Sequence, residues 1–196
     1  MISKFQNKNR IQSKTKNYIL SLFVLLITSI ISSLGGLSFQ GIESIITKVL
    51  PIIVIFPSLN DLMGNFAIVF SSKFSTWLYE GKIKEKYAFD NKEMKRLLRE
   101  ISIAGFQFSA IISFLGIFIS AIVEHQLNIV SSLKVFLISV AVVEILILFL
   151  FIIISVLGLY LFKKNKDPDE ILIPLSTSLA DFLTMVYVAS FVLLLF

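Results

Sequence analysis

The sequence predicts an all-α, polytopic membrane protein with five transmembrane helices. Hydrophobic residues make up 56% of the 196 residues, and the mean hydropathy is +0.88, well above that of a soluble domain. The apolar residues occur in blocks of roughly 20 or more, the length that a helix needs to cross a hydrocarbon layer of about 30 Å. Because most of the chain lies in such blocks, we expect one membrane domain over residues 18–196, after a basic tail at 1–17.

The first predicted span covers residues 18–37, and the second covers 45–78. Small residues near the end of the first span resemble those of a signal peptide. We nevertheless expect this span to be retained, because the apolar stretch is long and no clear A-x-A-like site follows. The second span would reach about 51 Å as one helix, which is too long for a straight crossing. Pro57 and Gly64 lie in its middle, so we expect a kink, a break or an extension beyond the bilayer.

The remaining predicted spans cover residues 101–123, 134–162 and 171–196. The third span has glycines and serines at helical spacing on one face, from Gly105 to Ser120, a pattern typical of close helix packing. The fourth span is apolar except for Glu144. This residue could be a second cation site, a proton carrier or a protonated acid bonded within the bundle, and the sequence leaves these alternatives open.

Lys and Arg gather in segments that a five-span chain places on one side of the membrane. The tail, the loop after the second span and the segment before the fifth span together hold fifteen of the 18 basic residues. The tendency of basic loops to stay in the cytoplasm predicts a cytoplasmic N-terminus and an outer C-terminus in the cell membrane. The net charge of +5 is therefore interpreted as a topology signal, and we expect lipid rather than nucleic acid as the partner of these residues.

The fifth span contains one ionisable residue, Asp181, about ten residues after the span begins. At 1.5 Å per residue its carboxylate would lie about 15 Å deep, near the middle of the hydrocarbon layer. A carboxylate at this depth costs several kcal/mol unless water, a partner or a cation compensates its charge. The position of Asp181 therefore predicts a site for positive charge.

Other polar residues share the helix face of Asp181. Pro174, Thr177, Ser178 and Thr184 follow helical spacing around it, as in a pore-lining surface. Alternatively, the hydroxyls bond back to carbonyls of their own helix, and Asp181 meets a donor on a neighbouring helix.

The second span also carries candidate cation ligands. Asn65 has a carbonyl oxygen suited to a hard cation or its water shell, and the alternative is plain bonding between helices. Asp61 is interpreted either as the cap of a helix that restarts after Pro57 or as a residue at an ion entrance. The chain has no cysteine and one histidine, so all of the candidate ligands are oxygen atoms, which disfavours soft metals.

Two motifs occur in order along the chain. The first is PSL from Pro57, followed by Gly64-Asn65 and the run SSKFST, and the second is Asp167-Pro168-Asp169, then Pro174, then SLAD ending at Asp181. Together they resemble the membrane domain of the MgtE magnesium transporters, and still more that of their eukaryotic solute-carrier relatives, with alanine before Asp181 where glycine is common. The resemblance covers about residues 18–196. It implies a five-helix fold and a cation pore lined by Asp181 and Asn65.

The resemblance also implies an assembly. Bacterial MgtE has a large magnesium-sensing region before its membrane domain, whereas about 17 residues precede the first span here, so the mode of gating stays open. The solute-carrier relatives fuse two such units in one chain. A single unit therefore implies a homodimer, in which a twofold axis would bring two Asp181 carboxylates to one pathway.

We therefore expect a transporter or channel for divalent cations, Mg²⁺ before Mn²⁺, Co²⁺ or Ca²⁺. The alternative is a Na⁺- or H⁺-coupled exchanger with Glu144 or Asp61 as the coupling site. A membrane enzyme is disfavoured, because the chain lacks the dense acidic motif of phospholipid head-group transferases, D-G-x2-A-R…G-x3-D-x3-D. A non-transporting scaffold is also disfavoured, because a deep carboxylate beside a stripe of hydroxyls has no evident purpose there.

Overall fold

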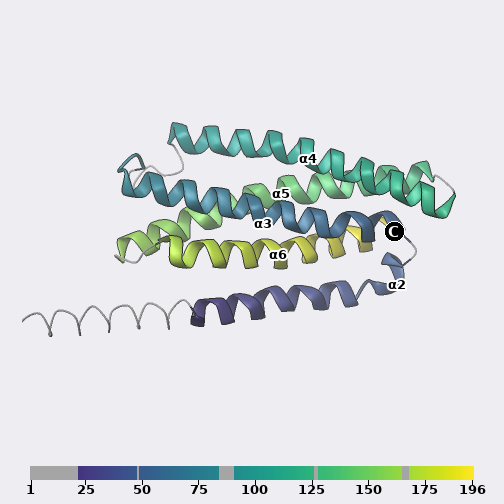
Figure 1. Ribbon diagram of the computed structural model, residues 1–196, viewed down its shortest axis with the longest axis horizontal. Coiled ribbons are helices and arrows are strands. Elements are labelled where there is room, and N and C mark those ends of the chain that lie inside the picture. The colour runs from purple at the N-terminus through teal and green to yellow at the C-terminus, as the bar shows by residue number, and fades with distance from the viewer. Residues whose placement is uncertain (1–21, 48, 84–90, 126–127, 165–167) are drawn as a thin grey trace, which may run out of the picture.

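The computed structural model describes residues 22–47, 49–83, 91–125, 128–164 and 168–196 (Figure 1). Within these residues, five helices are long and apolar enough to cross a membrane, as the sequence predicts. The first is described from Leu22 to Gln40 and is called the N-terminal helix below. The short α2 follows it. The bounds of the labelled helices are α2 Glu43–Ile46, α3 Leu50–Tyr79, α4 Lys92–Glu124, α5 Ile129–Lys163 and α6 Pro168–Leu195.

The helices α4 and α5 extend beyond the predicted spans because asparagine side chains cap their first turns. Asn91 accepts a hydrogen bond from the Glu93 backbone N–H at 2.8 Å, so α4 begins nine residues before the apolar block. Asn128 accepts from the N–H groups of Val130 and Ser131, both at 3.1 Å, and α5 starts there. Such caps satisfy N–H groups that have no partner within the helix. Hydropathy locates the apolar part of a helix, whereas these caps decide where it begins.

The long second span is divided between α2 and α3, and the division falls before Pro57. Helix α3 begins at Leu50, with Pro51 in its first turn, where proline is well tolerated. It then continues through Pro57 to Tyr79 without a second start. The interpretation of Asp61 as the cap of a restarted helix is therefore wrong. Pro57 removes one backbone hydrogen bond, which the packing of neighbouring helices in a membrane protein can offset.

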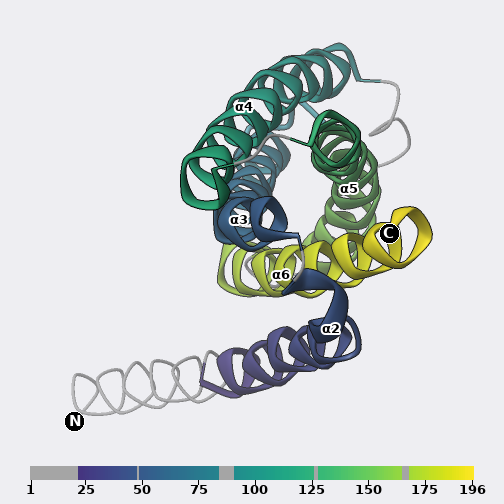
Figure 2. The ribbon, with the colours of Figure 1, turned by 90° about the vertical axis from the view of Figure 1, so that its right-hand side faces the viewer.

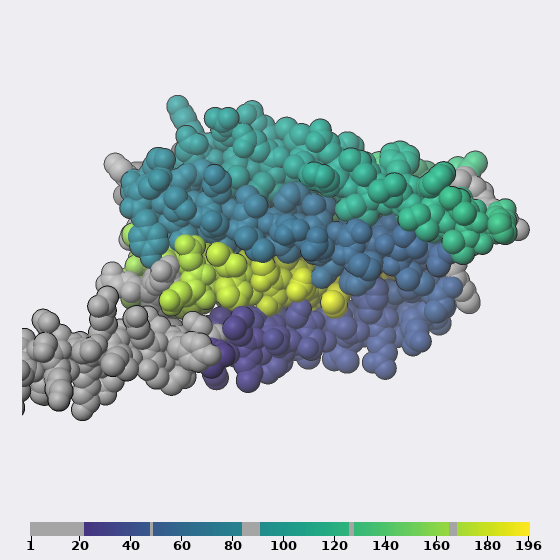
Figure 3. Space-filling model, viewed as in Figure 1, coloured from purple at the N-terminus to yellow at the C-terminus, as the bar shows by residue number. Residues whose placement is uncertain are grey.

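Helices α3 to α6 form a bundle, and the N-terminal helix lies outside it (Figures 1 and 2). Helix α3 packs against α4, α5 and α6. Seen end-on, the N-terminal helix runs beside α6, on the side away from α4 and α5. The space-filling view shows α6 between α3 and the N-terminal helix (Figure 3). Helix α6 therefore contacts both α3 and the first span of the chain.

Small residues allow close approach within the bundle, as is usual where lipid provides no hydrophobic drive between helices. A Cβ atom on Gly105 of α4 would lie 2.5 Å from Ile147 of α5, and one on Gly158 of α5 would lie 2.5 Å from the ring of Phe74 on α3. Ser113 hydrogen-bonds with Ser139 across the α4–α5 interface. The glycines and serines of α4 thus form the packing face that their spacing predicts; its members are Gly105, Ser109, Ser113, Gly116 and Ser120, all buried.

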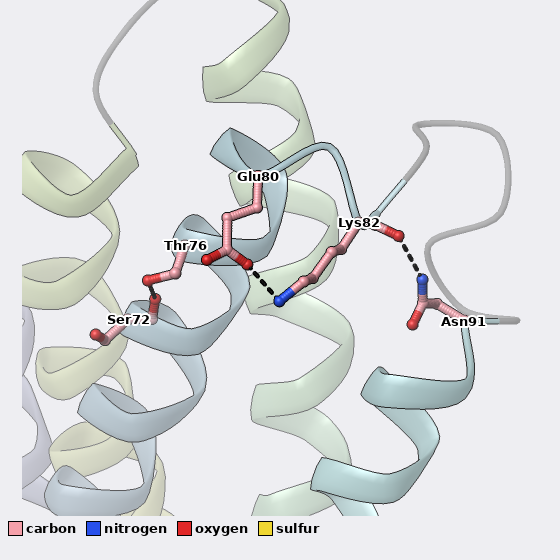
Figure 4. A network of polar contacts seen from close by, with 5 residues as sticks. All are labelled: Ser72, Thr76, Glu80, Lys82 and Asn91. Atoms are coloured by element: carbon pink, nitrogen blue, oxygen red, sulfur yellow. Dashed lines mark hydrogen bonds and ion pairs between the residues drawn. The ribbon is translucent and has the colours of Figure 1, made fainter.

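Polar contacts join the end of α3 to the start of α4 (Figure 4). Glu80 pairs with Lys82 at 2.7 Å, and the Asn91 side-chain amide donates to the Lys82 carbonyl at 2.8 Å. Thr76 donates to the Ser72 carbonyl of its own helix. These groups lie at the end of the bundle that leads into the loop after the second predicted span, whose sequence is rich in basic residues. Which end faces the cytoplasm stays a prediction of the charge pattern.

The contact at Gly158 yields a test of the packing. Replacing Gly158 with alanine forces the Phe74 ring to move, and we expect a loss of about 1–3 kcal/mol, typical of overpacked cores. Gly36→Ala is the matched control, because no atom lies within 4 Å of a Cβ atom there. Thermal unfolding in mild detergent should show a lower midpoint for Gly158→Ala and an unchanged or higher one for Gly36→Ala. Equal midpoints for the two variants would contradict this packing.

Candidate cation site

Asp181 lies near the midpoint of α6, roughly 20 Å from either end of the helix at 1.5 Å per residue. Its side chain is half-buried. The Asn60 side-chain amide of α3 donates to Asp181 Oδ1 at 2.9 Å, and the Ser32 hydroxyl of the N-terminal helix donates to Oδ2 at 3.0 Å. Each carboxylate oxygen thus has one neutral donor, and three helices converge on this group.

A groove of about 430 Å³ runs beside Asp181 between α3 and α6. Most of its wall comes from one face of α3, and α6 supplies the remainder. Gly64 contributes no side chain, and a Cβ atom there would lie 4.0 Å from Asp181 Oδ1. The carboxylate therefore reaches the groove past Gly64. The lining residues are Phe56, Pro57, Asn60, Asp61, Gly64, Asn65, Ile68, Thr177 and Asp181.

A second carboxylate shares the groove with Asp181. Asp61 is exposed on α3, and the Asn65 side-chain amide, one turn further along, donates to Asp61 Oδ2 at 3.1 Å. This bond turns the amide hydrogens of Asn65 towards Asp61. The structure thus places the predicted residues Asp61 and Asn65 on the same groove as Asp181.

Asn60 has a buried acceptor that the fold does not satisfy. Its amide group must face Asp181, because an ionised carboxylate only accepts hydrogen bonds. The carbonyl oxygen Oδ1 is then directed away from the carboxylate, and it is buried with no hydrogen-bond partner among the described residues. Such an orphaned acceptor costs about 1–3 kcal/mol. The buried position also keeps this oxygen out of contact with water in the groove.

The other predicted residues of α6 differ in how they relate to the groove. Thr177 lines it, and its hydroxyl bonds back to the carbonyls of Ile173 and Pro174, both at 3.0 Å. Ser178 and Thr184 are buried and lie outside the groove lining. Their hydroxyls donate to carbonyls of α6 itself, those of Pro174 and Ala180, at 2.9 Å and 2.7 Å. The structure agrees with the alternative in which the hydroxyls bond within α6 and Asp181 meets donors on neighbouring helices.

Glu144 lies in a different interface. It is on α5, and its Oε1 atom is buried without a partner in the described part of the chain. Gly105 leaves room for it, since a Cβ atom there would lie 3.5 Å from Oε1. Helix α5 contributes nothing to the lining of the groove. The structure thus brings Asp61, Asn65 and Asp181 together and leaves Glu144 apart.

The second sequence motif lies at the start of α6. Pro168 is the first helical residue, and Asp169 is exposed in the first turn, where a negative charge favours the helix dipole. Asp167 lies outside the described residues. Pro174 is within the helix and half-buried.

Two residues at the site were not among those predicted from sequence. Asn60 lies on the same helix face as Gly64, and its proximity to Asp61 was a usable signal. Ser32 is one of the small residues near the end of the first span that resemble those of a signal peptide. Its polar side chain three residues before Gly35 was the available signal, because small residues mark helix contacts in membranes.

The family model for MgtE, described as a divalent cation transporter, matches residues 56–191. The chain belongs to the MgtE family of divalent cation transporters. The match includes every groove-lining residue on α3 and α6 and begins after the N-terminal helix. No curated protein and no solved structure matches the chain significantly.

The oxygen atoms that line the groove suit a transported cation better than a tightly held one. Within the described residues, no three His, Cys, Asp or Glu side chains are grouped as they would be to hold a metal ion. One copy instead offers two carboxylates and amide carbonyls, all hard oxygen ligands of the type that Mg²⁺ and Ca²⁺ prefer. Sparse ligands keep binding weak enough for release, which conduction requires.

The separation of the two interfaces predicts different mutant phenotypes. Asn60→Val removes both the donor to Asp181 and the free carbonyl oxygen, so we expect divalent cation flux into proteoliposomes to fall by roughly tenfold or more. Glu144→Gln has a similar shape and lies outside the groove, so its flux should stay within about twofold of wild type. A loss of flux in Glu144→Gln with normal folding would place Glu144 in the transport machinery.

Proposed function

We propose that this MgtE-family chain transports Mg²⁺ across the cell membrane along the groove between α3 and α6. The observation that carries this proposal is the Asp181 carboxylate at mid-helix, held by donors from two other helices and open to a groove with further oxygen ligands. A fixed negative charge at this depth lowers the energy of a cation where the hydrocarbon would otherwise exclude it. The charge pattern supports a cytoplasmic N-terminus.

The size of the groove supports passage of a hydrated ion. Mg²⁺ dehydrates reluctantly and prefers six octahedral ligands, several of them water. The groove volume of about 430 Å³ is many times the volume of about 30 Å³ that one water molecule occupies in the liquid. The ion can therefore keep most of its inner waters, while Asp181, Asp61 and the amide oxygens accept hydrogen bonds from them. Mn²⁺, Co²⁺ and Ca²⁺ are competing cargoes that share this oxygen chemistry.

The placement of Glu144 supports movement of the cation down its own gradient. In a Na⁺- or H⁺-coupled exchanger, the coupling group is expected to share the pathway or contact it. Glu144 instead lies against Gly105 of α4. Asp61 lies in the groove and is the remaining candidate for coupling.

A homodimer would complete the pathway. In one copy, α3 and α6 supply the walls of an open groove. A second copy related by a twofold axis would present the same surface and bring a second Asp181 carboxylate. Two carboxylates would match the charge of one dication.

Asp181→Asn tests the proposed pathway. The change keeps the volume of the side chain but removes its charge, so a purely structural aspartate should tolerate it better than Asp181→Ala. Attraction between a dication and a carboxylate in a partly dehydrated site is worth several kcal/mol, so both variants should lose divalent flux by at least roughly a hundredfold. The measurement is Mg²⁺ entry into proteoliposomes loaded with a Mg²⁺-sensitive dye.

Matched conditions sharpen this test. Asp181→Glu should retain some flux with altered selectivity, because the carboxylate moves by about one methylene. Wild-type flux should not change when a Na⁺ or pH gradient is imposed; dependence on either gradient would favour the exchanger. Folded Asp181→Asn protein that transports at the wild-type rate would show that the pathway lies elsewhere, and Asp61→Asn would be tested next.

The assembly has a separate test. Light scattering in mild detergent should give about twice the protomer mass of 22.1 kDa. The same fraction should conduct Mg²⁺ after reconstitution. A strictly monomeric protein that still conducts would contradict the proposal that a second copy completes the pathway.

A further inference from the structure

The N-terminal helix lies outside the segment that matches the family, yet it contacts the central carboxylate of the site. The match begins at residue 56, within α3, whereas Ser32 lies on the N-terminal helix, the span before it. The Ser32 hydroxyl donates to Asp181 Oδ2 at 3.0 Å. This helix therefore supplies one of the two hydrogen bonds that hold Asp181.

One face of the N-terminal helix docks it beside the groove. Thr28, Ser32, Gly35 and Phe39 follow at intervals of four, three and four residues, so they lie along one side of the helix. A Cβ atom on Gly35 would lie 2.7 Å from the Met185 sulfur and 3.1 Å from the Phe182 Cα atom, so the N-terminal helix crosses α6 closely at Gly35. These contacts place the Ser32 hydroxyl about one helical turn from Gly35, where the N-terminal helix crosses α6.

An aromatic contact joins the same face to the groove wall. The ring centroids of Phe39 and Phe56 are 4.0 Å apart, and Phe56 lines the groove. The N-terminal helix is thus attached to α6 through Gly35 and to α3 through Phe39. Ser32 is held close to Asp181 by contacts on both helices.

The opposite face of this helix makes no comparable contact with the other described residues. Leu26, Ile30 and Leu37 on that face are each more than half exposed. Apolar surface facing lipid contributes little to helix association in a membrane, where small-residue packing and hydrogen bonds provide the specificity. The docking face with Ser32 and Gly35 therefore determines how the helix sits on the bundle.

We propose that Ser32 is a positioning residue for cation transport, and that the N-terminal helix remains docked on α6 while ions pass. This inference rests on the proposed role of Asp181. Each carboxylate oxygen carries two lone pairs, and Ser32 and Asn60 occupy one on each oxygen. The carboxylate is fixed against rotation, and its remaining lone pairs are available to the cation or its water shell. A preorganised ligand binds without first losing its own rotational freedom.

Removal of the hydroxyl tests the positioning role. Ser32→Ala should raise the half-saturating Mg²⁺ concentration by roughly tenfold, with the maximal flux within about twofold of wild type. Ser32→Thr keeps a hydroxyl and should restore the wild-type value. Ser33→Ala is the matched control, because Ser33 is exposed and its hydroxyl bonds to the Ser29 carbonyl of its own helix. A lower maximal flux with unchanged half-saturation, or no difference between Ser32→Ala and Ser33→Ala, would overturn the proposal.

A second experiment tests whether the helix stays docked. The chain contains no cysteine, and a Cβ atom on Gly35 would lie 3.3 Å from the Met185 Cβ atom, close to the separation of about 3.5–4.5 Å in disulfides. The double variant Gly35→Cys/Met185→Cys should therefore cross-link on oxidation and still transport Mg²⁺. The two single variants are the controls.

Each other outcome of the cross-linking experiment contradicts a stated part of the inference. Failure to cross-link would show that the helix is not docked as described. Flux that is lost on oxidation and recovered on reduction would show that the helix must leave α6, so that Ser32 belongs to a closed state. Asp181→Asn, measured in the same vesicles, separates the two proposals. If Asp181→Asn is inactive while Ser32→Ala behaves as wild type, the proposed role of Ser32 is wrong and the proposed role of Asp181 stands.

Discussion

The structure depends on how one carboxylate is accommodated in the middle of a membrane-spanning bundle. An ionised Asp181 requires compensation that hydrocarbon cannot provide. The fold supplies two neutral donors, Asn60 and Ser32, from two other helices. Neutral donors stabilise the charged form of the carboxylate and leave its charge in place, whereas a lysine or arginine would cancel that charge. The negative charge is therefore still available to a cation.

Small residues determine which surfaces of the helices meet. At the α4–α5 and α3–α5 interfaces, Gly105 and Gly158 bring helices into close contact. On the groove side, Gly64 has the opposite effect, because the missing side chain exposes Asp181 to open volume. Gly35 then brings the N-terminal helix close enough for the Ser32 hydrogen bond. The same residue type thus closes one interface and opens another, depending on what lies opposite.

The ligand set is consistent with weak, reversible binding. A structural metal site surrounds its ion with several charged side chains, whereas this groove has Asp61 and Asp181 as its only carboxylates among the described lining residues. The other oxygen ligands are neutral amides. The buried Oδ1 atom of Asn60 is an acceptor that the resting fold leaves unsatisfied.

The sequence alone determined the number of helices long and apolar enough to cross a membrane, the packing face of α4 and the mid-helix position of Asp181. These properties follow from hydrophobic length and helical periodicity, which are local along the chain. The break before α3 was misplaced, because Pro57 lies within a continuous helix. That error has a local cause as well: proline lowers helix stability, but neighbouring helices can compensate for one lost hydrogen bond.

Only the tertiary structure decided which polar residues meet. Periodicity places Thr184 and Asp181 on nearby positions of one helix, but it does not tell which neighbour covers each of them. The partners of Asp181 are 149 and 121 residues away in the chain, and their approach depends on how three helices cross. The same crossings place Glu144 against α4 rather than in the groove. Contacts between helices depend on the shape of both surfaces at once, and this information is not local to either segment.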